Sequence, residues 1–108
     1  MATFFRNATE NAIGPVEVLV ASSGSSARFT VIGMSLTNLT ESVVLATIRL
    51  EKASTSTYFI KEVIIPPNQS LRVINGGEKL IVDSSTDIYV KSNTDSSLDL
   101  IMSYVEIV

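Results

Sequence analysis

The stretch Arg28-Phe-Thr-Val-Ile-Gly-Met-Ser-Leu-Thr37 decides the fold. Its residues alternate with a period of two, because successive side chains of a β-strand point to opposite sides of a sheet, whereas a helix repeats about every 3.6 residues. β-Branched Val and Ile also suit a pleated, half-buried surface. The stretch therefore predicts a strand with two faces. One face holds Thr30, Ile32, Met34 and Leu36, and the other holds Phe29, Val31, Gly33 and Ser35.

Two further runs alternate in the same way. One face of 43–51 holds Val44, Ala46, Ile48 and Leu50, and one face of 98–107 holds Leu98, Leu100, Met102 and Tyr104. Clusters rich in Ser, Asn, Asp and Gly separate the runs, and such residues favour turns because they hydrogen-bond nearby backbone or reach positive φ. Strands separated by closely spaced turns predict an all-β fold, an antiparallel β-sandwich of jelly-roll or immunoglobulin-like type.

We predict about eight strands and a short N-terminal arm. Residues 2–6 are expected to form a short strand or arm, and 7–14 is the only stretch with the potential for a helical turn. Asn75-Gly76 is the best hairpin turn, since both residues tolerate positive φ. Pro66-Pro67 ends a strand, because proline cannot donate to a ladder. The predicted strands cover 16–21, 28–37, 43–51, 57–65, 71–74, 79–82, 87–92 and 98–106.

The composition is apolar for so small a chain. The 108 residues make one small domain, which we place at 16–108 after an arm or first strand at 1–15. Hydrophobic residues make up 45%, charged residues 18%, and the mean hydropathy is +0.35. Two predicted strand segments, 16–21 and 62–65, are apolar on both faces, whereas one face of an antiparallel sheet usually meets water. We expect another subunit to cover the excess apolar surface; the alternative is a monomer whose second sheet wraps around it.

The residue types that are missing argue against several function classes. The chain has no Cys and no His, which removes disulfides, thiolate metal sites, cysteine nucleophiles and the Ser-His-Asp relay. The lack of Trp weakens a sugar-stacking interpretation. A net charge of −3 creates no basic field for nucleic acid, and no apolar run approaches the roughly 20 residues of a membrane span. We therefore expect no enzyme, no cofactor, no nucleic acid and no membrane partner.

Acidic residues gather near the last two predicted loops, at Asp83, Asp87, Asp95 and Asp99. Calcium takes at least about six oxygen ligands, and carboxylates grouped in loops are its usual site. The spacing of these residues matches no calcium loop, however, and Asp is common in turns for structural reasons. We therefore expect no metal site.

Six residues are candidate contacts to another subunit or to a lattice. Adjacent Phe side chains near a chain end point to opposite sides if extended, and they either complete the domain's own sheet or reach another subunit. An Arg beside a rigid Pro-Pro loop can form a bidentate pair across an interface; the alternative is a solvated sheet face. The candidates are Phe4, Phe5, Arg6, Pro66, Pro67 and Arg72.

Several segments resemble small virion proteins of tailed bacteriophages, particularly those of cyanobacterial and marine hosts. The likeness is carried by Ile65-Pro-Pro-Asn-Gln-Ser-Leu-Arg-Val-Ile-Asn-Gly-Gly-Glu-Lys-Leu-Ile-Val82, by 87–92 and 98–107, and by the segments 1–7 and 31–40. It covers nearly the whole chain. It implies a β-sandwich that serves assembly, with no catalytic residues to transfer.

Composition and resemblance lead to one functional expectation. We predict a non-enzymatic virion structural protein that is assembled in the host cytoplasm and works as a homo-oligomer, with a trimer favoured. The favoured position is the capsid exterior, as a decoration or cement protein that contacts the major capsid protein or other virion proteins. A neck, tail or baseplate component is the alternative, and a host-surface or carbohydrate-binding module is the third hypothesis.

Overall fold

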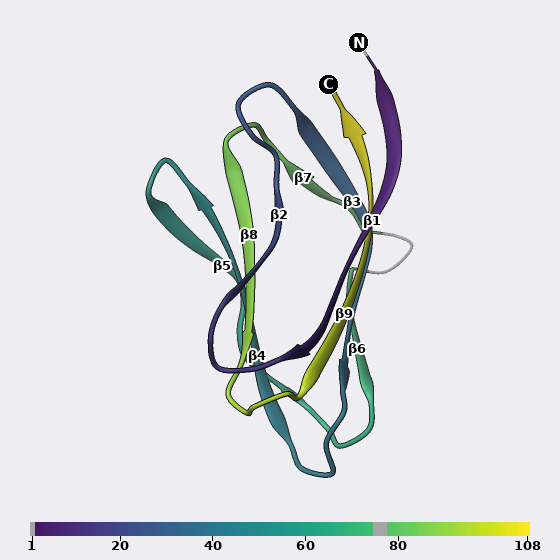
Figure 1. Ribbon diagram of the computed structural model, residues 1–108, viewed down its shortest axis with the longest axis vertical. Coiled ribbons are helices and arrows are strands. Elements are labelled where there is room, and N and C mark those ends of the chain that lie inside the picture. The colour runs from purple at the N-terminus through teal and green to yellow at the C-terminus, as the bar shows by residue number, and fades with distance from the viewer. Residues whose placement is uncertain (1, 75–77) are drawn as a thin grey trace.

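Two antiparallel layers of strands form the molecule (Figure 1). The computed structural model describes residues 2–74 and 78–108. Within them no helix occurs, and so none is long and apolar enough to cross a membrane. The predicted all-β sandwich is confirmed. Its strands are β1 (Thr3–Ile13), β2 (Val18–Ser22), β3 (Arg28–Asn38), β4 (Val44–Lys52), β5 (Thr55–Ile65), β6 (Ser70–Ile74), β7 (Leu80–Val82), β8 (Thr86–Ser92) and β9 (Leu98–Ile107).

The strand order is that of a jelly roll. Sheet A has the order β1-β9-β3-β6, with β7 also paired to β3, and sheet B has the order β2-β8-β4-β5. The early strands thus pair with the late ones in reverse order: β1 with β9, β2 with β8, β3 with β6 and β7, and β4 with β5. A long hairpin that curls into two sheets produces this double Greek-key arrangement. The topology therefore selects the jelly roll over the immunoglobulin-like order, which the sequence left open.

The core lies between the sheets and follows the predicted alternation along β4 and β9. Val44, Ala46 and Ile48 are fully buried, and so are Leu98 and Met102 on the facing sheet. Burial of each of the larger side chains contributes about 1.5–3 kcal/mol. The inner faces of these two strands are therefore the ones that their sequence pattern predicts.

β3 departs from the predicted alternation at Ile32. Its pairing with β9 shifts register between Val31 and Gly33, so one extra residue is inserted at this point. Phe29 and Val31 therefore point into the core together with Met34. The prediction that placed them on the face of Gly33 was wrong, because an inserted residue moves every preceding side chain to the other face.

The N-terminal segment forms a longer strand than predicted. β1 continues to Ile13 and pairs with β9 of the same chain. Reciprocal main-chain hydrogen bonds of 3.0 and 2.9 Å join Ala2 and Val108 beyond the strand ends. Residues 7–13 are extended and not helical, and the left-handed backbone at Ala12 (φ 54°) accompanies a bulge before the strand ends. The segment thus completes the domain's own sheet, which was one of the two alternatives.

The β4–β5 hairpin has a two-residue turn. Ala53 and Ser54 both have left-handed backbone, with φ of 51° and 65°, and turns of this kind match the twist of the strands that they join. β5 therefore begins at Thr55, two residues before the predicted start. The hairpin turn predicted at Asn75-Gly76 lies outside the described residues.

Candidate functional site

The outer face of sheet B carries an ion-pair cluster centred on Arg49. Its guanidinium donates from Nε (2.7 Å) and Nη2 (2.9 Å) to the two carboxylate oxygens of Glu17, and from Nη1 (2.7 Å) to Glu51. The guanidinium carbon also lies 4.2 Å from the centre of the Tyr89 ring. The Arg49 side chain is only 16% exposed, so partners on three sides hold it against the sheet. Bidentate pairs of this geometry are the strong form of the ion pair.

The same contacts shift the pKa values of both partners. The hydrogen bond from Arg49 is the main reason why the pKa of Glu17 is lowered. The pKa of Arg49 is raised, first by its hydrogen bond to Glu17 and then by that to Glu51. Arg49 and Glu17 therefore both stay charged at neutral pH, and their ion pair has a structural role on this face.

Replacing Glu17 by Gln is expected to lower the free energy of unfolding by about 1 kcal/mol at pH 7. A carboxyl whose pKa is lower in the folded state contributes stability above its unfolded pKa and loses that contribution as the pH falls through the folded pKa. The free energies of unfolding of the Glu17→Gln variant and the unsubstituted protein, measured in urea, should therefore converge below pH 4.5, which is the unperturbed pKa of the group. Exposed Glu41, replaced by Gln, is the control. A Glu17→Gln difference that stayed constant between pH 7 and pH 3 would contradict this account.

The outer face of sheet A carries a group of exposed apolar side chains among uncharged polar ones. Strand pairing places Phe5, Val105, Thr30 and Ile81 in one row across β1, β9, β3 and β7, and residues directly opposite each other share a face. Phe5 is 82% exposed and Ile81 72% exposed. The apolar face, as we call this surface from here on, consists of Phe5, Thr30, Ile32, Gly33, Ile81, Ile101, Ser103 and Val105.

Charged side chains lie at the two ends of the apolar face. Arg28 pairs with Ile107 at one end, and Asp99 of β9 lies at the other end. Arg72 of β6 lies in the row of Ser35 and Ile101, at the β6 edge of the face. The centre of a protein contact surface is usually depleted of charge, and the apolar face has that pattern.

A hollow of about 290 Å³ lies within the apolar face, beside Gly33. Ile101 and Ser103 flank it on β9, and Arg72 borders it on β6. A Cβ added to Gly33 would meet no heavy atom of the described residues within 4 Å. The missing side chain of this glycine therefore contributes directly to the space.

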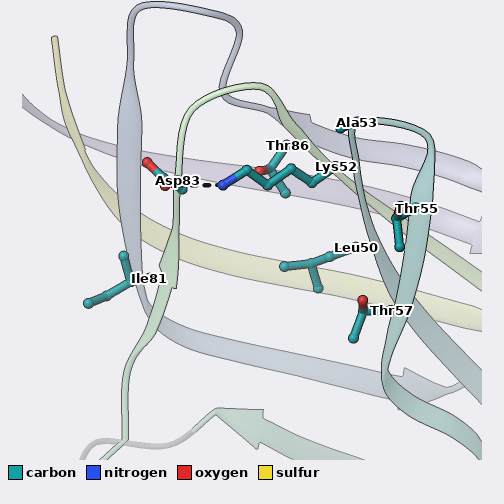
Figure 2. A pocket seen from close by; sticks show the side chains of 8 residues that line it. All are labelled: Leu50, Lys52, Ala53, Thr55, Thr57, Ile81, Asp83 and Thr86. Atoms are coloured by element: carbon teal, nitrogen blue, oxygen red, sulfur yellow. Dashed lines mark hydrogen bonds and ion pairs between the residues drawn. The ribbon is translucent and has the colours of Figure 1, made fainter.

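A second hollow, of about 500 Å³, opens at the edge of the sandwich between β7 and the β4–β5 hairpin (Figure 2). Leu50 points from β4 toward β7, Thr57 lies on β5, and Ile81 borders the hollow on β7. The Lys52 Nζ donates to the Asp83 carboxylate at 3.2 Å across one end. The described lining residues are aliphatic, hydroxyl-bearing or charged and provide no aromatic ring, so this hollow gives no support to sugar stacking.

The structure separates the predicted contacts at the N-terminal segment. Phe5 lies on the apolar face, whereas Phe4 and Arg6 point to the opposite side of β1. The Arg6 Nε donates to the Glu106 carboxylate at 2.7 Å, and its guanidinium carbon lies 4.8 Å from the centre of the Phe4 ring. Phe4 and Arg6 are thus engaged with their own chain, while Phe5 is exposed.

The other predicted contacts lie on different parts of the surface. Arg72 shares the outer side of sheet A with Phe5 and borders the hollow beside Gly33. Pro66 and Pro67 lie in the turn between β5 and β6, at the end of the molecule opposite the N-terminus (Figure 1). The structure therefore brings two of the six candidates to one face and leaves the Pro-Pro turn apart from it.

Sequence reasoning did not single out the isoleucines of the apolar face. A signal existed for Ile101, because it lies on the second face of an alternating run whose first face is already apolar. Ile81 lies in a strand of three residues, too short to show a period. Ile32 was grouped on one face with Met34 and Leu36, and the bulge separates it from them.

The acidic loop residues support local structure. Asp87 accepts a hydrogen bond from the Ser22 hydroxyl at 2.5 Å, and Asp99 accepts one from the Ala12 main-chain N–H at 3.0 Å. Among residues 2–74 and 78–108, no three acidic, His or Cys side chains group as a metal ion requires. The predicted structural role of these carboxylates fits their contacts.

Comparisons with known proteins identify the fold and no family. No protein-family model matches the chain, and a search of curated proteins finds no match. A solved structure of Bacillus endospore appendages, a family of disulfide-linked pili, matches with a TM-score of 0.58 and 9% identity, over 97% of this chain and 85% of that chain. A structure of infectious bursal disease virus, Gx strain, matches with a TM-score of 0.47 and 8% identity, over 97% of this chain and 35% of that chain. The first likeness shows a shared fold, and the second is too distant to support an argument.

Proposed function

We propose that this protein is a non-enzymatic structural component of a bacteriophage virion and works as a homo-oligomer. The apolar face carries the proposal, because a contiguous exposed apolar surface with charges at its margins is typical of a protein contact. The resemblance of the sequence to small virion proteins agrees with it. The fold shared with a pilus-forming appendage adds support by analogy alone.

Contacts between copies would be non-covalent. The chain contains no cysteine, so it cannot form links of the kind named for the Bacillus pili. Burial of apolar surface would supply the free energy of association, and repetition over many sites would multiply a modest contact.

Within the virion we place the protein on the capsid exterior, as a decoration or cement protein whose favoured form is a trimer. A protein that binds the mature shell of major capsid protein stabilises that shell by mass action, at every site that it occupies. A neck, tail or baseplate component is the alternative. A carbohydrate-binding module is less favoured, because the described residues that line these two hollows, beside Gly33 and between β7 and the β4–β5 hairpin, include no aromatic platform.

The purified protein is expected to have the mass of an oligomer at micromolar concentration in light scattering or sedimentation equilibrium. In disrupted particles, many copies should fractionate with empty heads if it decorates the capsid. A few copies in the tail fraction would instead favour the neck, tail or baseplate alternative. A mass of 11.6 kDa at every concentration tested would contradict the proposed self-association.

A further inference from the structure

We infer that copies of this chain meet through the apolar face, so that its occupant is the same face of a second copy. The inference rests on the proposed self-association and adds the surface and the contact to it. The outer face of sheet B is less suited, because Arg49, Glu17 and Glu51 already neutralise one another there.

The exposed area fits a contact between copies. Phe5, Ile81, Ile101 and Ile32, which are 82, 72, 56 and 39% exposed, together present on the order of 500 Å² of mostly apolar surface. A stable interface buries about 800 Å² per partner, of which roughly 65% is apolar between identical subunits. The apolar area available on this face is therefore close to what such an interface requires, and Thr30 and Ser103 supply neighbouring polar surface.

The charge pattern allows this face to meet itself. A surface that packs against its own copy brings like residues close together, and like charges at its centre would repel. None of the residues that define the apolar face is charged; Arg28 and Asp99 lie toward its ends, and Arg72 lies at its β6 edge, beside the Gly33 hollow. Self-contact thus places one cation, Arg72, at the border of the hollow and no charge among the apolar side chains.

The face also carries a knob and a hole. Phe5 projects from β1, and the hollow beside Gly33 lies two strands away on β3, with β9 between them. In a symmetric oligomer the projecting side chain of one copy can fill the hollow of another copy. In a dimer the two copies do this reciprocally, and in a trimer each copy fills the hollow of the next. We place the Phe5 ring of one copy in the Gly33 hollow of the next.

Two substitutions on this face test the surface. Gly33→Leu fills the hollow, and Gly33 does not have the left-handed backbone that would make the change strained. Ile101→Lys puts a charge at the flank of the hollow. We expect the association constant to fall at least about tenfold for Gly33→Leu and about a hundredfold for Ile101→Lys, as measured by sedimentation equilibrium. Ile64→Lys, at a 62% exposed position on the outer face of sheet B, is the matched control and should leave the mass unchanged.

Cysteine cross-linking tests the knob-and-hole contact directly. Because the chain has no cysteine, a Phe5→Cys/Gly33→Cys variant contains only the two introduced thiols. The two positions lie two strands apart on one sheet, about 10 Å or more, which is too far for a disulfide within one copy. We expect a covalent dimer or trimer on oxidation, and none from a Phe5→Cys/Ile64→Cys variant.

The outcomes separate the two proposals. If the protein without substitutions is monomeric at all concentrations, the proposed self-association is overturned, and the proposed contact surface with it. An oligomer whose mass survives both Gly33→Leu and Ile101→Lys, with circular dichroism and thermal unfolding showing folded protein, overturns this surface alone. Covalent oligomers from the Ile64 pair in place of the Gly33 pair would do the same.

Discussion

Replacing Asn38 by Ala is expected to lower the free energy of unfolding by about 3–5 kcal/mol. Asn38 is 1% exposed at the end of β3. Its side-chain amide donates to the carbonyls of Ser42 (2.8 Å), Ile65 (3.0 Å) and Pro66 (3.1 Å), and its Oδ1 accepts from the main-chain N–H and the hydroxyl of Thr40, both at 2.8 Å. One side chain thus joins two turns to the end of β5. Alanine would remove the Asn38 partner from the Thr40 N–H and from the carbonyls of Ile65 and Pro66, whereas the Ser42 carbonyl keeps its hydrogen bond from the Thr40 hydroxyl (2.9 Å). Loss of several hydrogen bonds at a buried junction is far costlier than loss of one exposed hydrogen bond.

Urea unfolding of matched variants checks this expectation. Asn93→Ala is the control, because Asn93 is exposed and its Oδ1 accepts a main-chain hydrogen bond from Leu45 (2.9 Å). That change should cost about 1 kcal/mol or less. Asn38→Asp keeps the acceptor oxygen and loses all three donations, so we expect it to be as destabilising as alanine at pH 7. Equal effects of the Asn38 and Asn93 alanine variants would show that the buried amide is not the junction described here.

Replacing Phe29 by Ala is also expected to lower the free energy of unfolding, by about 3–5 kcal/mol. Phe29 is 2% exposed, and its ring centre lies 4.7 Å from that of Tyr104 on the neighbouring β9, with the planes tilted by 45°. The substitution removes this aromatic contact and leaves a cavity between the sheets. Because the total stability of a domain of this size is about 5–15 kcal/mol, the loss is a large fraction of the whole.

Thermal unfolding should show the effect as a fall in Tm of more than about 12 °C. Tyr104→Phe is the control, because it keeps the ring that packs on Phe29 and removes only the hydroxyl. It should change the stability by less than about 0.5 kcal/mol. If the Phe29→Ala protein unfolds within a few degrees of the unsubstituted protein, the contact between the Phe29 and Tyr104 rings does not contribute to the core as described here.

The regular strands of this fold could be predicted from sequence because their physics is local. In β4 and β9 each second residue is apolar, and the pleat places these residues on the inner face. The bulge at Ile32 has no comparable signal in the sequence. A single inserted residue changes no composition, and a Gly beside it reads like any other small strand residue.

The candidate contact surface was predicted only where one residue is unusual by itself. The sequence drew attention to Phe5 as one of two adjacent aromatic residues near the start of the sequence, and to Arg72 as a cation beside a proline loop. Ile81 and Ile101 are ordinary strand residues, and they join the same surface only because β7 and β9 flank β3. Asn38 is similar, since its partners come from two turns far apart in the sequence. Properties that depend on pairing between distant segments cannot be read from either segment alone.

The central position of β9 has a consequence for the order of folding. This strand lies between β1 and β3 and is the neighbour that joins them in sheet A. During translation it leaves the ribosome after the eight other strands that the structure describes, so β1 remains without its β9 partner until residues 98–107 have emerged. The β4–β5 hairpin, whose strands adjoin in sequence, needs no such wait. We therefore expect the nascent chain to form that hairpin early and to close its other layer only after residues 98–107 have been synthesised.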